Sequence, residues 1–490
     1  MFETEIQAKH VESAEEPLQD EVTADFFESM EAETAAFPRP NPIPVPIPRP
    51  WPLFQGSRFM IWKQDPTVTT LGRRLLYLPR RILNGPRDAR INTVLPGTTP
   101  VNRSISGDFI FPPDTPEADC AHTFAVVRET LTLYERKGGG TAIPWAWNRN
   151  GNTDVLSVQP RGFNGANAYY SRNAKSLRFG YFRPRNSSQT VYTCRSLDIV
   201  AHETGHAILD GLKPGWLGYG NPPQTGGLHE SFGDLTAIFL ALSQLDQVEA
   251  VIALSRANLH NRNFLKRLAE QFGQSLGRSE GLRNADNDLK LSQVSNEVHA
   301  ISKVFTGGIY DVLADIFNYE RHRQRDTAGP ARVLLEVSRQ LSDLLLDALI
   351  QAPDTGATYA DVVNRMLQIS HANGEPAIYR TFIRNRFTYR EVVVSPTPLT
   401  AMTQGQIDLD NPDFVEGEDL MELETAFPDH PSLVATQDRS GCCGTMQSPE
   451  YLQDQKVLDA NLARLSKPGV VLDEESLLED EMKHLAKSFK

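Results

Sequence analysis

Apolar residues return every three or four positions in several stretches of the second half of the chain. Between residues 196 and 212 this pattern predicts a helix, and Gly211 with Pro214 supplies its end. Further helices are predicted over about 229–245, 297–317, 331–351 and 358–371, where signals for strands are rare. This part of the chain is therefore expected to be mainly helical.

The first half of the chain has a different pattern. From residue 55 to about 190, short runs of β-branched and aromatic residues alternate with Gly, Asn and Pro, and one helical stretch interrupts them near residues 122–137. The predicted fold class is therefore α+β. We expect a strand-rich N-terminal subdomain over 55–212, which includes the helix at 196–212, and a helical C-terminal subdomain over 213–402.

The two ends of the chain differ from this body in charge and composition. Residues 1–36 hold 11 acidic residues and one basic residue, and residues 403–490 hold 19 acidic and 7 basic ones. Because the whole chain has a net charge of −13, residues 37–402 carry +9. The acidic ends are predicted to be solvated and disordered. The alternative, that they dock on the basic body, stays open.

Proline stands at nearly every second position between residues 37 and 54. Each proline ring fixes φ and removes a backbone donor, so this segment is predicted to be an extended polyproline II linker. It separates the acidic N-terminal segment from the body.

The sequence lacks the features of a membrane protein or of a classically exported one. No apolar run approaches the roughly 20 residues that span a bilayer, and the acidic amino terminus is unlike a signal peptide. The four cysteines have neither a metal-type spacing nor the density of a disulfide framework. We expect a cytoplasmic protein, or one exported by a route without a signal peptide, with no transmembrane segment. No nucleic-acid partner is expected either, because the basic body carries no nucleic-acid-binding signature.

The predicted helix at 196–212 carries the sequence H-E-x-x-H. His202 and His206 are four residues apart, so both imidazoles point to one side of the helix and can reach one ion. A catalytic zinc ion takes three protein ligands and leaves a position for water, so a third ligand must follow downstream. Glu203 lies beside the pair rather than in it, where it can take a proton from the attacking water as general base.

Two acidic residues downstream are candidates for the third zinc ligand and for a residue that orients a ligating histidine. Glu230 and Asp234 lie four positions apart, on one face of the predicted helix at 229–245. Glu230 is predicted to be the third ligand. Asp234 is expected to orient a ligating histidine, because a carboxylate that accepts from an imidazole fixes the ring and raises its basicity. Considered alone, Asp234 would be an ordinary solvated position on a helix.

Two segments together resemble the active-site signature of the thermolysin-like neutral zinc metallopeptidases: D-I-V-A-H-E-T-G-H, which begins at Asp198, and H-E-S-F-G-D, which begins at His229. The resemblance implies the two-lobed zincin fold, with the active-site helix between the two subdomains. It also implies a zinc-dependent endopeptidase that acts on protein or peptide substrates, with one catalytic Zn²⁺ ion and no covalent acyl-enzyme.

Three further positions follow from this resemblance. The segment N-G-A-N-A-Y-Y, from residue 164, resembles the edge strand on which the family binds the substrate backbone, which implies substrate-binding roles for Asn167 and Ala168. The segment V-H-A-I-S, from residue 298, is similar to the helix that bears the family's transition-state histidine, and this implies that His299 hydrogen-bonds the developing oxyanion. Tyr219 is the implied second oxyanion donor.

The chain departs from the family's pattern in three places. His229 stands where Asn usually precedes the third ligand, and V-S-N-E at 294–297 stands where an Asp usually precedes the transition-state histidine. Asp198, expected to lie behind the ligands, matches a calcium-binding residue of many relatives. Apolar residues at 238–241 replace an expected acid, however, so the calcium sites of relatives are expected to be absent.

These departures leave a second function open. The alternative is a catalytically weak or inactive metallopeptidase-like protein that acts as a partner-binding scaffold through its proline-rich segment and acidic ends. If the chain is an enzyme, residues 3–33 are a candidate inhibitory pro-segment, which long-range attraction would hold on the basic cleft.

Overall fold

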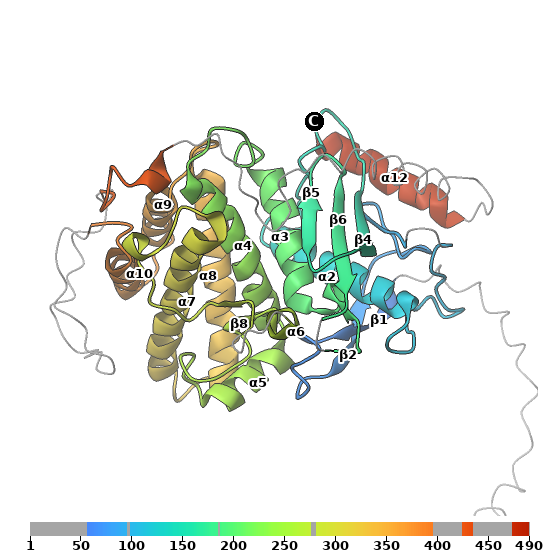
Figure 1. Ribbon diagram of the computed structural model, residues 1–490, viewed down its shortest axis with the longest axis horizontal. Coiled ribbons are helices and arrows are strands. Elements are labelled where there is room, and N and C mark those ends of the chain that lie inside the picture. Colours follow the sequence, from blue (N-terminus) through green and yellow to red (C-terminus); the bar gives the residue numbers. More distant parts are fainter. Residues whose placement is uncertain are drawn as a thin grey trace, which may run out of the picture. The chain divides into compact units, whose positions relative to one another are not determined.

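The computed structural model describes residues 56–95, 99–184, 187–275, 281–394, 424–434 and 473–489. The predicted acidic segment 1–36, the predicted linker and most of the range 403–490 lie outside the described residues. All described residues belong to one unit, Phe54–Lys490. This unit contains both helices and sheets, which agrees with the predicted α+β class (Figure 1).

The N-terminal part of the unit is built on a five-stranded mixed sheet. Its strand order is β3-β4-β6-β5, and β7 also pairs with β6. Strand β4 is parallel to β3 and β6, whereas β5 and β7 run antiparallel to β6. Strand β5 pairs with β6 alone among the described strands, which makes it an edge strand. The bounds are β1 Ser57–Trp62, β2 Arg73–Leu78, β3 Ile91–Thr93, β4 Leu156–Asn164, β5 Ala168–Ser171, β6 Ser176–Phe182 and β7 Val191–Tyr192, and β1 pairs with β2 in a separate hairpin.

Helices make up most of the remainder. The helices predicted near 122–137, 196–212, 229–245, 297–317, 331–351 and 358–371 are confirmed as α2, α3, α4, α7, α8 and α9, although α2, α4 and α7 extend beyond the predicted bounds. Their bounds are α2 Pro116–Glu135, α3 Leu197–Leu212, α4 Pro223–Leu242, α5 Leu245–Ser255, α6 Glu270–Ser275, α7 Val298–Arg323, α8 Pro330–Gln351, α9 Tyr359–Ala372, α10 Ala377–Tyr389 and α12 Asp473–Ser488. Two short strands, β8 Arg267–Leu268 and β9 Arg283–Asn284, pair between α5 and α7.

Helix α4 forms the centre of the helical part. Every one of its residues is buried, and it packs against α3 on the side of the sheet and against α7 on the other side (Figure 1). Its own apolar side chains, such as Leu235, Ile238 and Leu242, are packed in the core. Burial of each such side chain contributes about 1.5–3 kcal/mol to the stability of the fold. The candidate zinc ligands on α3 and α4 are therefore held on two helices of the core.

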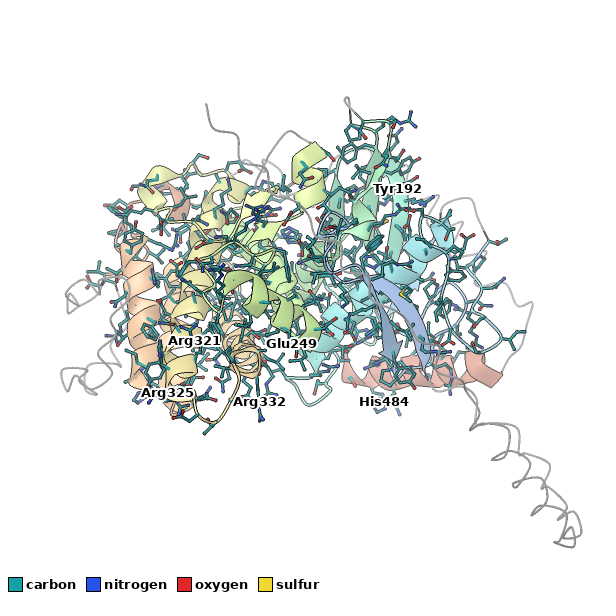
Figure 2. The ribbon with its side chains drawn as sticks, turned by 90° about the horizontal axis from the view of Figure 1, so that it is seen from below. Tyr192, Glu249, Arg321, Arg325, Arg332 and His484 are labelled. Atoms are coloured by element: carbon teal, nitrogen blue, oxygen red, sulfur yellow. The ribbon has the colours of Figure 1, made fainter. Side chains whose placement is uncertain are left out.

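Two segments from the predicted C-terminal tail lie against the body. Glu424 O accepts from Val394 N at 2.9 Å, and the Ser432 hydroxyl accepts from the Gln224 amide at 2.9 Å. Farther along, α12 presents Leu478, Met482 and Leu485 at helical spacing to a small apolar cluster with Leu83 and Ala89. Helix α12 thus packs against the segment that contains Leu83 and Ala89. His484, labelled in Figure 2, lies on this helix.

No single helix among the described residues is long and apolar enough to cross a membrane. Helices α4 and α5 pass the same test of length and composition only as a pair, and they are bent by 97° at their junction.

Candidate metal centre

Helix α3 places His202 and His206 on the side that faces α4. Their rings lie one turn apart, with centroids 4.6 Å from each other and planes at 88°. Both side chains are buried. The four-residue spacing produces this arrangement directly, because residues i and i+4 of a helix share a face.

Two glycines allow α4 to approach α3 closely enough for a third ligand to reach the histidines. A Cβ atom on Gly233 would lie 2.6 Å from His202 Nδ1, and one on Gly205 would lie 3.2 Å from Gly233 Cα. Larger residues at these positions would therefore push the helices apart. The close contact brings Glu230 Oε2 to 3.5 Å from His202 Nε2, and Oε1 to 3.4 Å from His206 Nε2.

These three side chains form a donor set that fits a zinc ion. One ligand atom from each of His202, His206 and Glu230 lies within 4.8 Å of the others. Two imidazole nitrogens and one carboxylate oxygen are the ligands expected of a catalytic zinc site. Asp234 Oδ1 lies 2.9 Å from His202 Nδ1, a distance at which it can hold the ring with Nε2 toward the site.

His206 is held by another histidine. Its Nδ1 lies 2.7 Å from His229 Nδ1, and His229 is fully buried. If His206 Nε2 binds a metal ion, its Nδ1 carries the proton and donates to His229 Nδ1. Burial and the nearby His206 hold the pKa of His229 well below its usual value, which favours the neutral acceptor ring.

We expect His229 to act as the acceptor that orients His206, and this can be tested by substitution. His229→Asn supplies an amide oxygen in place of the ring nitrogen, so its zinc affinity should stay within a few-fold of wild type. His229→Leu removes the acceptor and should weaken zinc binding by about 10–100-fold. Competition with a chromophoric chelator measures both affinities. Equal affinity of the Leu variant and the wild type would contradict this role.

Glu230 is an anion in a buried position. Burial alone would raise its pKa, but the nearby His206 and hydrogen bonds with His202 and His206 lower the pKa of Glu230 well below its usual value. Arg283 adds a further cation, because its guanidinium lies 3.2 Å from Glu230 Oε2. The carboxylate is thus kept ionised, which is the form that binds a metal ion.

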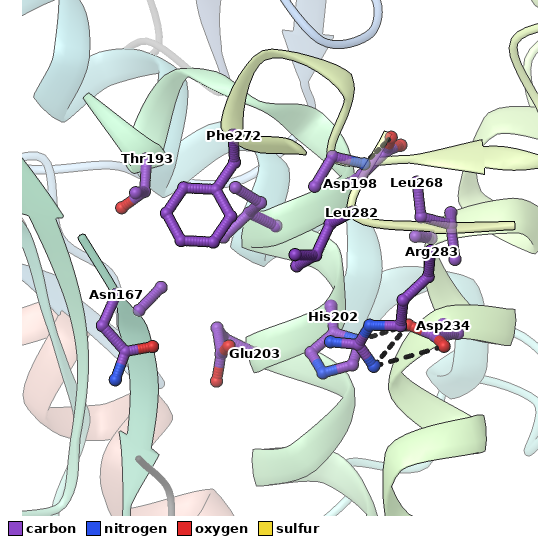
Figure 3. Close-up of a pocket in the computed structure, with 14 residues that line it drawn as sticks. Asn167, Thr193, Asp198, His202, Glu203, Asp234, Leu268, Phe272, Leu282 and Arg283 are labelled. Atoms are coloured by element: carbon purple, nitrogen blue, oxygen red, sulfur yellow. Dashed lines mark hydrogen bonds and ion pairs between the residues drawn. The ribbon is translucent and has the colours of Figure 1, made fainter. Parts of the chain in front are cut away.

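Glu203 faces a narrow pocket of about 50 Å³ beside His202. Figure 3 shows Glu203 on α3 and Asn167 next to β5 at this pocket, and Ala168 also lines it. The pocket's apolar wall is formed by Ile199, Ala237, Leu268, Phe272 and Leu282. The structure therefore brings the predicted general base, the predicted substrate-binding residues and one ligand to a common cavity, with β5 as an edge strand.

Arg283 is a site residue that sequence analysis missed. It lies on β9 and contacts Glu230 Oε2 at 3.2 Å and Asp234 Oδ1 at 3.1 Å. Figure 3 shows Arg283 beside Asp234. Its side chain is only 10% exposed. Arg283 is one of two arginines in the stretch 271–292, and no periodic pattern distinguishes it from a surface residue, so no local sequence signal could have identified it.

His299 also reaches the candidate centre, from the first turn of α7. Its Nε2 lies 3.5 Å from Glu230 Oε2, and its Nδ1 lies 2.5 Å from Glu297 Oε1. Glu297 is the N-cap of α7 and also accepts from Ala300 N at 2.8 Å. Glu297 is thus placed to orient the His299 ring from two residues away.

Of the remaining two predicted residues, Asp198 lines the pocket at Glu203, whereas Tyr219 does not. Tyr219 is in the connection between α3 and α4, its side chain is 76% exposed, and it is not among the residues that line the pocket at Glu203. Its role as an oxyanion donor remains a prediction. Asp198 lies in the first turn of α3, where its Oδ2 accepts from Ala269 N at 3.2 Å.

Asp198 is one of two buried carboxyls at this end of α3. Burial raises the pKa of Asp198 well above its usual value, and the nearby Asp65 raises it further. Burial likewise raises the pKa of Asp65. A carboxyl whose pKa is raised on folding contributes to stability below its unfolded pKa of about 4 and loses this contribution as the pH rises through its folded pKa. Neutral pH is therefore unfavourable for this pair.

We expect Asp198→Asn to stabilise the protein at pH 7, because the amide imitates the protonated carboxyl. The free energy of unfolding should rise on the order of 1 kcal/mol at pH 7 and change little at pH 4. Thermal unfolding at both pH values measures this, with Asp326→Asn, at a side chain 85% exposed, as the control. A loss of stability at pH 7 that depends on added calcium would contradict it and indicate a cation at these carboxyls.

Comparison with known proteins gives little beyond these observations. No family model matches the chain, and no curated protein matches it by sequence. The chain is similar in structure to the precursor of protealysin, a metalloproteinase from Serratia proteamaculans, with 13% identity and a TM-score of 0.40 over 63% of this chain and 87% of that chain. A TM-score this low does not establish a common fold, so the residues of the site decide the functional question.

Proposed function

We propose that this chain is a zinc-dependent endopeptidase. The observation that carries the proposal is the convergence of His202, His206 and Glu230 on one point, with the acid Glu203 next to these ligands but outside the set. Three ligands leave a position for water in a catalytic zinc site. A structural zinc site would instead be closed by a fourth protein ligand, whereas the group formed at this point by the described residues has three members.

Each residue around this point has a role in amide hydrolysis. When bound, the zinc ion supplies Lewis acidity to the scissile carbonyl and to the attacking water. Glu203 takes the proton from that water and passes it to the leaving nitrogen. His299, oriented by Glu297, donates a hydrogen bond to the developing oxyanion. Asp234 and His229 keep the two ligating rings in place.

The binding of substrate fits an endopeptidase. An extended peptide can add to the edge strand β5 through main-chain hydrogen bonds, which do not depend on its sequence. The apolar wall of the pocket at Glu203 would then receive one apolar side chain next to the scissile bond. Arg283 also lines this pocket, where its guanidinium could donate to a substrate carbonyl.

The proposal is tested on the full chain by zinc content and casein hydrolysis together. We expect one tightly held equivalent of zinc per chain at the candidate centre, loss of hydrolysis after chelation, and recovery when zinc is added back. Zinc without hydrolysis, also after removal of residues 1–36, would favour the alternative of a partner-binding scaffold on this fold. A chain that hydrolyses casein equally well before and after complete chelation would overturn the zinc mechanism.

A further inference from the structure

A second group of metal-ligating side chains lies in the helical part and shares no residue with the candidate metal centre. His260 follows α5, Asp286 follows β9, and Asp311 lies in the middle of α7. One ligand atom from each of the three lies within 4.8 Å of the others. His260 Nδ1 and Asp286 Oδ1 are 2.8 Å apart. This set offers one imidazole nitrogen and two carboxylate oxygens, whereas the candidate metal centre offers two imidazole nitrogens and one carboxylate oxygen.

In each of the two carboxylates, the Oδ2 atom is held by a cationic side chain. Lys266 Nζ lies 2.8 Å from Asp286 Oδ2, and the Arg390 guanidinium lies 2.7 Å from Asp311 Oδ2. Arg386 also meets Asp311 at Oδ2, at 3.6 Å. Each carboxylate therefore keeps its other oxygen for a different partner, an arrangement that is typical of carboxylates that bind metal ions.

The group lies at a hollow that water can enter. The cavity has a volume of about 720 Å³, and His260, Asp286 and Asp311 are all in its lining. Asp288 and Asp315 line it as well, so its carboxylates outnumber its two arginines, Arg321 and Arg386. Arg321 is labelled in Figure 2. Water could complete the coordination of an ion here.

We propose that His260, Asp286 and Asp311 bind a second divalent transition-metal ion, of the class that accepts mixed nitrogen and oxygen ligands, such as zinc. The ion takes the place of the hydrogen bond between His260 Nδ1 and Asp286 Oδ1. This site is expected to be weaker than the candidate centre, because three cations, Lys266, Arg386 and Arg390, contact its carboxylates, whereas Arg283 is the cation that contacts Glu230. The proposal does not depend on whether the chain hydrolyses peptides.

An ion at this site would also restrain the segment 283–286, whose Arg283 contacts the candidate centre. Asp286 stands three residues after Arg283, whose guanidinium contacts Glu230 and Asp234. An ion held by Asp286, Asp311 and His260 would tie this segment to α7 and to the loop that follows α5. Occupancy is therefore expected to stabilise the chain against thermal unfolding.

The test is a calorimetric titration of the chelator-stripped full chain with zinc. We expect two classes of sites in the wild type, and loss of the weaker class in His260→Ala, with an affinity at least about tenfold lower, while the tighter class stays. Asp286→Asn should act in the same way. His322→Ala removes another histidine from the same cavity lining and should keep both classes.

The second site would be overturned by one class of sites in the wild type at the candidate centre, or by the same two classes in wild type and His260→Ala. Loss of the weaker class in His322→Ala but not in His260→Ala would also overturn it. A wild type that binds zinc only at the site removed by His260→Ala would support this inference and contradict the proposed catalytic centre, so the two failures can be told apart.

Discussion

Glu203→Gln is expected to lower kcat for casein or peptide hydrolysis by about 10²–10⁴-fold, because the amide cannot take a proton from the attacking water. Zinc content should not change, since Glu203 lies outside the ligand set of His202, His206 and Glu230. The substitution keeps the shape of a side chain that is 2% exposed, so the fold should be retained. Initial rates and elemental analysis on the same preparations measure both quantities.

A matched control separates loss of the base from a general effect of removing a charge. Glu249→Gln changes the same residue type at an exposed position on α5, labelled in Figure 2, and should leave hydrolysis unchanged. If Glu203→Gln keeps more than about a tenth of the wild-type rate, Glu203 is not the general base. If it loses its zinc, Glu203 supports the ligands in a way that the proposed mechanism lacks.

His299→Phe is expected to reduce kcat by about 10²–10³-fold, the usual effect of removing one oxyanion donor. KM should change much less, because the interaction is formed mainly in the transition state. The zinc content should stay at the wild-type value, since His299 is not one of the three ligands. Steady-state kinetics on a peptide substrate separate kcat from KM.

Glu297 offers a further test of the same role. Glu297→Ala removes the acceptor that lies 2.5 Å from His299 Nδ1, so it should lower kcat by a smaller factor than His299→Phe does. The double variant should have almost the same kcat as His299→Phe alone. His322→Phe, in the last turn of the same helix, should have no effect on hydrolysis. Full additivity of the Glu297 and His299 substitutions would show that Glu297 does not act through His299.

Much of the architecture follows from local pattern, and the elements that sequence analysis missed have identifiable causes. Helix α2 begins at Pro116, ahead of the predicted start, with Thr115 as its cap. Helices α5, α6, α10 and α12 were not predicted: α5 is a short apolar run directly after the predicted helix at 229–245, α6 has only six residues, and α10 and α12 carry several charged residues. The C-terminal segment shows this best. Its acidic composition predicts a solvated tail, yet Leu478, Met482 and Leu485 give α12 an apolar face.

Two local arrangements at the candidate centre follow from the amino-acid sequence alone. The four-residue spacing aligns His202 with His206 on one helix face, and the same spacing aligns Glu230 with Asp234 on another, because the helical period is local. How these pairs meet depends on the tertiary structure. The glycines at 205 and 233 let α3 and α4 approach, and β9 delivers Arg283 to Glu230. These contacts join distant parts of the chain, and local periodicity does not encode the loop paths that bring them together.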